Sequence, residues 1–97
     1  MIITVLGCGS IGQRHLTGLT GLREELKISE LRAFDTNAER VDAVAKRLKG
    51  VEKRSDLGSA VRGADVVFFC VPTAAHVPVY ESIKDLGAFH IFMEKPL

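Results

Sequence analysis

Three glycines near the start of the chain have the spacing of a loop that can bind a diphosphate group. Gly7, Gly9 and Gly12 directly follow the apolar residues 2–6, in the order G-x-G-x-x-G. In such a loop the first glycine permits a tight turn, the second lets the backbone approach the phosphates, and the third lets the next helix pack closely. Free N–H groups at the start of that helix then face the anion. We therefore expect contacts to a dinucleotide from Gly7, Cys8, Gly9, Ser10, Ile11 and Gly12.

A carboxylate further along the chain adds a second contact of the same kind. Asp35 ends the apolar stretch 31–34, about twenty residues beyond the loop, where such folds place an acid that accepts hydrogen bonds from the adenosine ribose. A carboxylate repels the 2′-phosphate of NADP, so NAD is the preferred cofactor and NADP the alternative. Arg40 lies one helical turn further on and could reach a phosphate. The other interpretation is a simple tight turn with an ordinary loop acid.

Size and composition restrict the class of protein. The 97 residues suffice for one domain, and 46% apolar with 26% charged residues is typical of a soluble globular chain. A net charge of +1 gives no electrostatic basis for binding nucleic acid. The opening apolar run is too short for a signal peptide or a membrane span, so we expect a cytoplasmic protein without a membrane partner. Cys8 and Cys70 do not form a metal-binding pattern, and we expect no metal site.

Hydrophobic periodicity predicts strands that alternate with helices. Residues 11–21 and 36–50 have helical spacing, the second with a capping box at Thr36 and Glu39 and a stop at Gly50. Further helices are expected over 55–62, capped by Ser55, and from 75–77 to 86. Strands are expected at 2–6, 31–34, 51–53, 65–71 and 89–93. This alternation predicts an α/β fold with a doubly wound parallel sheet of about five strands in the order 3-2-1-4-5.

The end of the chain completes a set of motifs. They are Gly7-Cys8-Gly9-Ser10-Ile11-Gly12 with Arg14-His15, then Asp35, then Val71-Pro72-Thr73 with His76, and Glu94-Lys95-Pro96-Leu97. Together they resemble the N-terminal NAD(P)-binding domain of the glucose-fructose oxidoreductase and inositol dehydrogenase family, Gfo/Idh/MocA. The resemblance covers almost the whole chain. It implies a Rossmann-type domain over residues 1–97, truncated after the Glu-Lys-Pro motif and without the C-terminal substrate domain.

The resemblance also implies an activity and further site residues. Family enzymes bind NAD or NADP across the strand ends and pass a hydride between nicotinamide and a CH–OH carbon of a sugar, polyol or related small molecule. Lys95 would be the catalytic residue beside the nicotinamide, where its cation favours a developing alkoxide, unless it is an ordinary solvated lysine. The remaining cofactor contacts implied are Val71, Pro72, Thr73, His76, Glu94 and Lys95.

Two other residue types in these motifs have more than one interpretation. Arg14 is either a phosphate contact at the helix start or a surface side chain. His15 and His76 match family positions, but we expect them to act in packing or capping rather than as bases.

One departure from the family limits the expected function. Family enzymes continue with a further helix and strand and then a domain that carries a catalytic histidine, whereas this sequence stops at Leu97. We therefore expect a domain that binds nucleotide but is inactive alone, with a small-molecule substrate only in a longer parent or complex. The alternative is a non-enzymatic nucleotide-binding or interaction module that assembles with another chain. An apolar fifth strand at a sheet edge also predicts a homo-oligomer paired through that strand.

Overall fold

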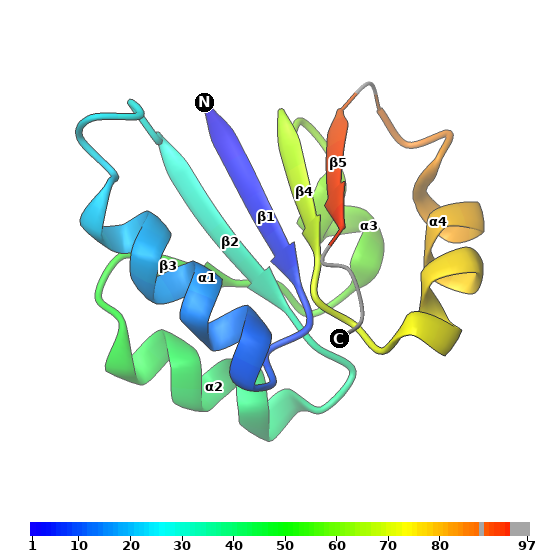
Figure 1. Ribbon diagram of the computed structural model, residues 1–97, viewed down its shortest axis with the longest axis horizontal. Coiled ribbons are helices and arrows are strands. Elements are labelled where there is room, and N and C mark those ends of the chain that lie inside the picture. Colours follow the sequence, from blue (N-terminus) through cyan, green and yellow to red (C-terminus); the bar gives the residue numbers. More distant parts are fainter. Residues whose placement is uncertain (88, 94–97) are drawn as a thin grey trace.

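The chain forms one parallel sheet with helices on both of its faces (Figure 1). The computed structural model describes residues 1–87 and 89–93. Its strand order is β3-β2-β1-β4-β5, and every pairing is parallel. The strands are β1 (Ile2–Leu6), β2 (Glu30–Phe34), β3 (Val51–Lys53), β4 (Val66–Phe69) and β5 (His90–Met93). The predicted doubly wound α/β fold, with five strands in the order 3-2-1-4-5, is therefore confirmed.

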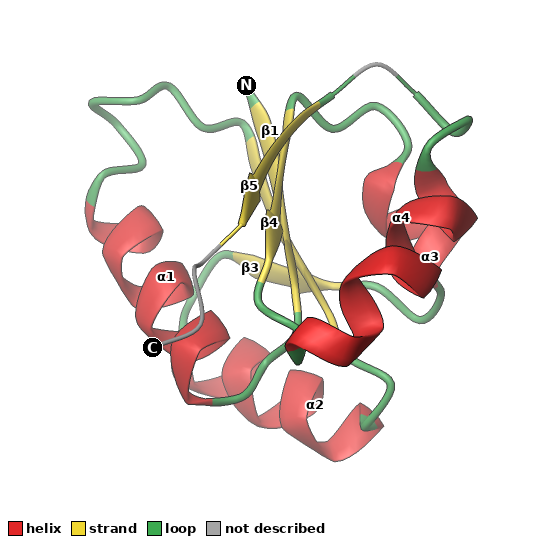
Figure 2. Ribbon diagram, turned by 45° about the vertical axis from the view of Figure 1, so that its right-hand side comes forward, coloured by secondary structure: helices red, strands yellow, loops and turns green. Residues whose placement is uncertain are grey.

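Helices cover the two faces as separate layers (Figure 2). On one face α1 (Ser10–Gly21) and α2 (Ala38–Arg47) pack against the sheet, and on the other lie α3 (Leu57–Val61) and α4 (His76–Ile83), which follows the 3₁₀ turn η1 (Thr73–Ala75). Successive β1 side chains alternate between these layers: Val5 belongs to the α1 and α2 core and Leu6 to the α3 and α4 core. Burial on both faces explains why β1 and β4 are apolar almost throughout.

Two helix caps differ from the sequence-based expectation. The N-cap of α2 is Asn37, whose side-chain oxygen accepts from the Glu39 amide at 3.0 Å, and not Thr36. The N-cap of α3 is Asp56, which accepts from the Ser59 amide at 2.8 Å, and not Ser55. In both cases an Asn or Asp side chain lies one position closer to the helix than the Thr or Ser. Its oxygen, and not the hydroxyl, accepts the hydrogen bond from the free amide.

The ends of two later elements also differ. The helix that begins at His76 ends at Ile83 and not at Leu86, and the last strand begins at His90, one residue later than expected. Leu86 and Phe89, in the connection between them, still pack on the α3 and α4 core as partly buried side chains. Apolar residues can pack from a loop as well as from a helix, so the pattern alone overestimates helix length.

Polar groups inside the sheet have defined partners. Arg32 in β2 is 7% exposed and donates through Nη1 to the carbonyl oxygens of Ala60 and Arg62 at the end of α3. The buried Thr4 hydroxyl donates to the same Ala60 carbonyl. These bonds satisfy carbonyls that a short helix leaves free at its end, and they fix α3 to the sheet.

No helix in the described part of the chain is long and apolar enough to cross a membrane.

The Cys8 thiol is part of the core between the sheet and α1. Cys8 is fully buried and lies two residues after the end of β1. Burial raises the pKa of Cys8 to about 12, and the Asp35 carboxylate and Cys70 act in the same direction. The thiol therefore stays protonated throughout the neutral range and behaves as a small apolar group.

Alkaline pH should destabilise the fold through this thiol. Between pH 9 and 12 the unfolded chain loses the Cys8 proton while the folded chain keeps it, so the free energy of unfolding falls by up to about 1.4 kcal/mol per pH unit. Urea unfolding of the wild type and of Cys8→Ala at pH 8, 9, 10 and 11 measures this effect. The variant starts less stable, and the difference between the two proteins should shrink as the pH rises. Parallel pH profiles would contradict it.

Candidate functional site

A cavity of about 830 Å³ opens at the carboxyl ends of the central strands. Its walls come from the glycine-rich loop, the end of β2, the start of α3 and the segment that leads from β4 into α4. This is the sheet edge at which the chain leaves β1 for α1 on one face and β4 for α4 on the other (Figure 1). In open α/β sheets, ligands bind in the crevice outside the carboxyl ends of the strands, where such connections diverge.

Two of the three loop glycines are required by the fold itself. A Cβ on Gly12 would lie 1.8 Å from the Gly7 carbonyl oxygen, so α1 can approach the end of β1 only if this residue has no side chain. Gly7 has a φ of +101°, and a Cβ there would lie 2.6 Å from the Cys70 carbonyl oxygen. Any larger residue at either position would clash with backbone.

Gly9 differs, because within the described residues nothing requires a glycine there. Its φ is −74°, an ordinary value, and the nearest atom to an added Cβ is Nη1 of Arg40 at 3.9 Å. Gly9 itself lines the cavity, so the space beside its Cα belongs to the cavity. A residue with no side chain at this point leaves room for a ligand to reach the backbone.

The start of α1 offers free amide groups to the same space. Gly9 is the N-cap and no side chain caps the helix; the first helical bond runs from the Gln13 amide to the Gly9 carbonyl at 2.9 Å. Ser10 and Ile11, in the first turn, line the cavity and are exposed. Ile11 is 48% exposed, so it does not pack in the core as Leu16 and Leu19 of the same helix do. Uncapped amides at a helix start favour an anion.

Asp35 joins the glycine-rich loop to the start of α2. Its Oδ2 accepts from the Cys8 amide at 2.7 Å and its Oδ1 from the Asn37 amide at 2.8 Å. Each carboxylate oxygen has further lone pairs for a hydroxyl donor from a ligand. The side chain is half-buried and lines the cavity. The two features that the sequence singled out separately, the loop and the acid, are thus in direct contact.

Arginines lie differently from what the motifs suggest. Arg14 is exposed and is not among the residues that line the cavity, so its phosphate contact stays a prediction. Arg40 does line the cavity, and its guanidinium lies beside Gly9. Both arginines follow the end of a strand by a few residues, so only their positions in the structure show which of them lines the cavity.

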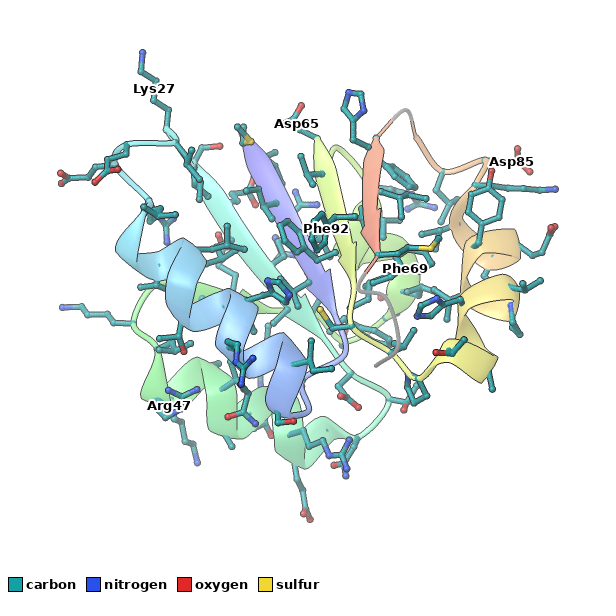
Figure 3. All side chains as sticks on the ribbon, viewed as in Figure 1. Lys27, Arg47, Asp65, Phe69, Asp85 and Phe92 are labelled. Carbon is teal, nitrogen blue, oxygen red and sulfur yellow. The ribbon has the colours of Figure 1, made fainter. Side chains whose placement is uncertain are left out.

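The opposite wall consists of the segment after β4. Val71, Pro72, Thr73 and His76 all line the cavity. The Nε2 of His76 lies 3.0 Å from the Val71 carbonyl oxygen, and its ring packs edge-on against Phe69 with centroids 5.8 Å apart (Phe69 is labelled in Figure 3). His76 therefore fixes the shape of this turn. His15 lies elsewhere, against the rings of Phe68 and Phe92.

Beside Asp35 is a smaller cavity of about 390 Å³, and its two cations are already paired. Lys53 contacts Asp42 at 2.8 Å, whereas Arg54 contacts Glu30 at 3.1 Å and Glu52 at 3.5 Å. An anionic group placed here would have to compete with these carboxylates and with Asp35 itself.

The predicted catalytic motif cannot be placed in the same way. Glu94, Lys95, Pro96 and Leu97 lie outside the described residues. Met93, the last residue of β5, pairs with Phe69, the last residue of β4. β5 therefore ends at the same sheet edge as the cavity.

Sequence reasoning missed one residue that touches the loop. Gln13 donates through Nε2 to the Cys8 carbonyl at 3.0 Å. It belongs to none of the motifs, and a polar residue in the second turn of a helix is usually solvated. The sequence shows a glutamine directly after the last loop glycine, but this does not indicate that its side chain bonds to the Cys8 carbonyl.

Comparison with known proteins agrees with this geometry. Residues 1–97 match the GFO_IDH_MocA family, described as an oxidoreductase family with an NAD-binding Rossmann fold. No curated protein matches the chain.

Several solved structures share the fold at low identity. UDP-N-acetylglucosamine 3-dehydrogenase GnnA from Acidithiobacillus ferrooxidans is 28% identical with a TM-score of 0.83, over 99% of this chain and 30% of GnnA. A putative myo-inositol dehydrogenase from Sinorhizobium meliloti is 28% identical with a TM-score of 0.76, over 99% of this chain and 28% of its own.

A third relative was solved with a cofactor. The WlbA dehydrogenase from Chromobacterium violaceum, in complex with NADH and UDP-GlcNAcA, is 25% identical with a TM-score of 0.75, over 99% of this chain and 27% of WlbA. The chain thus spans less than a third of the length of each of these three relatives. Since the family match extends over all of its residues, the chain belongs to the Gfo/Idh/MocA oxidoreductases and has their NAD-binding Rossmann fold.

Proposed function

We propose that the cavity binds NAD and that the chain is the nucleotide-binding part of an oxidoreductase that acts on CH–OH groups of a sugar, polyol or related small molecule. The observation that carries the proposal is Gly9: the fold does not require a glycine there, but a diphosphate on the α1 amides does. The names of the relatives, a nucleotide-sugar dehydrogenase and an inositol dehydrogenase, support this class of substrate.

Each wall of the cavity binds a different part of the cofactor. The loop from Gly7 to Gly12 takes the diphosphate, with the Arg40 guanidinium beside it. The Asp35 carboxylate takes the hydroxyls of the adenosine ribose. The segment formed by Val71, Pro72, Thr73 and His76 takes the nicotinamide half. The residues that line the cavity thus match the two phosphates, the diol and the flat ring of the dinucleotide.

NAD is the preferred cofactor over NADP. Asp35 stands where a 2′-phosphate would meet a carboxylate, and the nearby cations Lys53 and Arg54 are paired with acids. Arg40 is the remaining cation at the cavity within the described residues, and it faces Gly9. The site therefore offers a 2′-hydroxyl an acceptor but offers a 2′-phosphate repulsion.

Lys95 is the proposed catalytic residue, and Glu94 adds a contact near the nicotinamide. A bound nicotinamide supplies a hydride acceptor or donor. With NAD bound, the ammonium group of Lys95 would donate a hydrogen bond to the reacting hydroxyl and favour negative charge on its oxygen. We propose that the other substrate contacts belong to a longer parent or a complex and that residues 1–97 alone are inactive, since the chain spans less than a third of the length of the three relatives.

A second copy of the chain is the proposed partner at β5. This strand is an edge of the sheet, with neighbour β4 on one side only within the described residues. Phe92 is 45% and Met93 46% exposed, and consecutive strand residues point to opposite faces. Two such edges related by a twofold axis would pair their free backbone groups and cover both side chains.

Substituting Gly9 by alanine should separate binding from folding. Because an added Cβ would make only an ordinary van der Waals contact, with Nη1 of Arg40 at 3.9 Å, we expect Gly9→Ala to fold with nearly unchanged stability but to bind NADH about 10-fold or more weakly, since the methyl group holds the diphosphate off the amides. Fluorescence titration with NADH and thermal unfolding of the same samples measure both quantities.

Gly18→Ala is the matched control, because it adds the same methyl group inside α1, away from the cavity, where no atom of the described residues lies within 4 Å. It should keep the wild-type NADH affinity and gain about 0.5–1 kcal/mol of stability from better helix propensity. Equal NADH affinity of Gly9→Ala and the wild type would refute the assignment of the loop.

Cofactor preference can be measured directly. Calorimetric titration with NADH and NADPH should give tighter binding of NADH, by about 10-fold, because Asp35 repels the additional phosphate. Arg40→Gln should then weaken both cofactors equally if Arg40 serves the diphosphate. A loss confined to NADPH would mean that Arg40 binds the 2′-phosphate, and tighter NADPH binding by the wild type would overturn the preference for NAD.

Lys95 should affect turnover and not cofactor affinity. In a longer chain or complex that supplies the substrate-binding residues, Lys95→Met should lower kcat by about 100-fold or more while the NADH affinity stays within twofold. Lys49→Met, a change of the same kind at an exposed lysine after α2, should leave kcat unchanged. Equal activity of the Lys95 variant and the wild type would exclude a catalytic role.

A further inference from the structure

The peptide bond between Cys8 and Gly9 is held by a side chain outside the glycine motif. Its carbonyl oxygen, on Cys8, accepts from Nε2 of Gln13 in α1 at 3.0 Å. The peptide before it is held as well, because the Cys8 amide donates to Asp35 at 2.7 Å. The backbone at Cys8 is thus fixed on both sides, by Gln13 of α1 and by Asp35 in the connection from β2 to α2.

Gln13 is itself held by the neighbouring helix. Its Oε1 accepts from Nη2 of Arg47 at the end of α2, at 3.2 Å (Arg47 is labelled in Figure 3). A carboxamide can donate with its nitrogen and accept with its oxygen at the same time. Gln13 therefore links Arg47 to the loop, and neither a carboxylate nor an ammonium group could make both bonds.

Fixing the Cys8 carbonyl also fixes the Gly9 amide. In a planar trans peptide the C=O and the N–H point in opposite directions. Gln13 draws the carbonyl toward α1, so the Gly9 N–H points away from it, and within the described part of the chain that amide has no protein acceptor. A carbonyl that accepts a hydrogen bond also makes the N–H of the same peptide a better donor.

We propose that Gln13 is a positioning residue that aims and strengthens the Gly9 amide as a donor to the diphosphate, with Arg47 holding Gln13 in place. This inference rests on the proposed function for its ligand. It differs from a general structural role, because the effect must be confined to the phosphate-binding part of the cavity.

The test uses Gln13→Met, which is neutral and of similar length but makes neither bond. In the free protein the Gly9 amide proton should move upfield in the ¹H–¹⁵N spectrum. The affinity for NADH and for ADP should fall about 5-fold to 10-fold, as expected when one hydrogen bond to a charged group is weakened but not lost, while the affinity for adenosine, which has no phosphate, stays unchanged. Loss of adenosine affinity to the same extent would overturn the proposal in favour of a structural role.

Arg47→Met tests the second link, and Lys46→Met is its matched control, because it removes one positive charge from the exposed side of the same helix. Arg47→Met should reproduce the direction of the Gly9 shift and a smaller loss of ADP affinity, whereas Lys46→Met should change neither. If the wild type binds neither NADH nor ADP, the proposed function fails, but the Gly9 shift in Gln13→Met still decides whether Gln13 holds this amide. An unmoved Gly9 signal overturns the inference.

Discussion

The site depends on how closely α1 approaches the end of β1. A single methyl group on Gly12 would overlap the Gly7 carbonyl oxygen, so the helix start can reach the sheet edge only because residue 12 has no side chain. This contact places the free amides of the first turn beside the ends of β2 and β4, which pair with β1 on either side. A cavity with helix-start amides in its wall, a place that favours anions, follows from strand order and helix packing together, before any charged side chain is considered.

Charged and polar side chains then make the loop rigid. Asp35 bonds to the amide of Cys8 and Gln13 to its carbonyl, and each of these residues has a further partner on the β2–α2 side, Asn37 or Arg47. A loop rich in glycine would lose much conformational freedom when it binds a ligand. Hydrogen bonds that fix it beforehand reduce that loss, so in the proposed NAD complex the carboxylate of Asp35 would contribute through the loop as well as through its own contacts.

The sequence predicts the sheet well because the relevant signals are local and strong. Apolar runs, the glycine spacing and the stop at Gly50 each determine one element, and the right-handed crossover rule orders them. It predicts less well which polar side chain faces which backbone group. The cap of α2 is Asn37 and not Thr36, and the cap of α3 is Asp56 and not Ser55. Arg40, and not Arg14, lines the cavity. Such outcomes depend on differences of one position and on side-chain length, which a residue pattern does not encode.

The three glycines also show why a motif is weaker evidence than the geometry around it. Gly7 and Gly12 are explained by backbone contacts within the chain, so their presence would be the same in a protein that binds nothing. Of the three, Gly9 alone has no such contact within the described residues, and it lines the cavity together with Arg40, Asp35 and the start of α1. The functional information in the motif is therefore concentrated in the one glycine that the fold could replace without a clash.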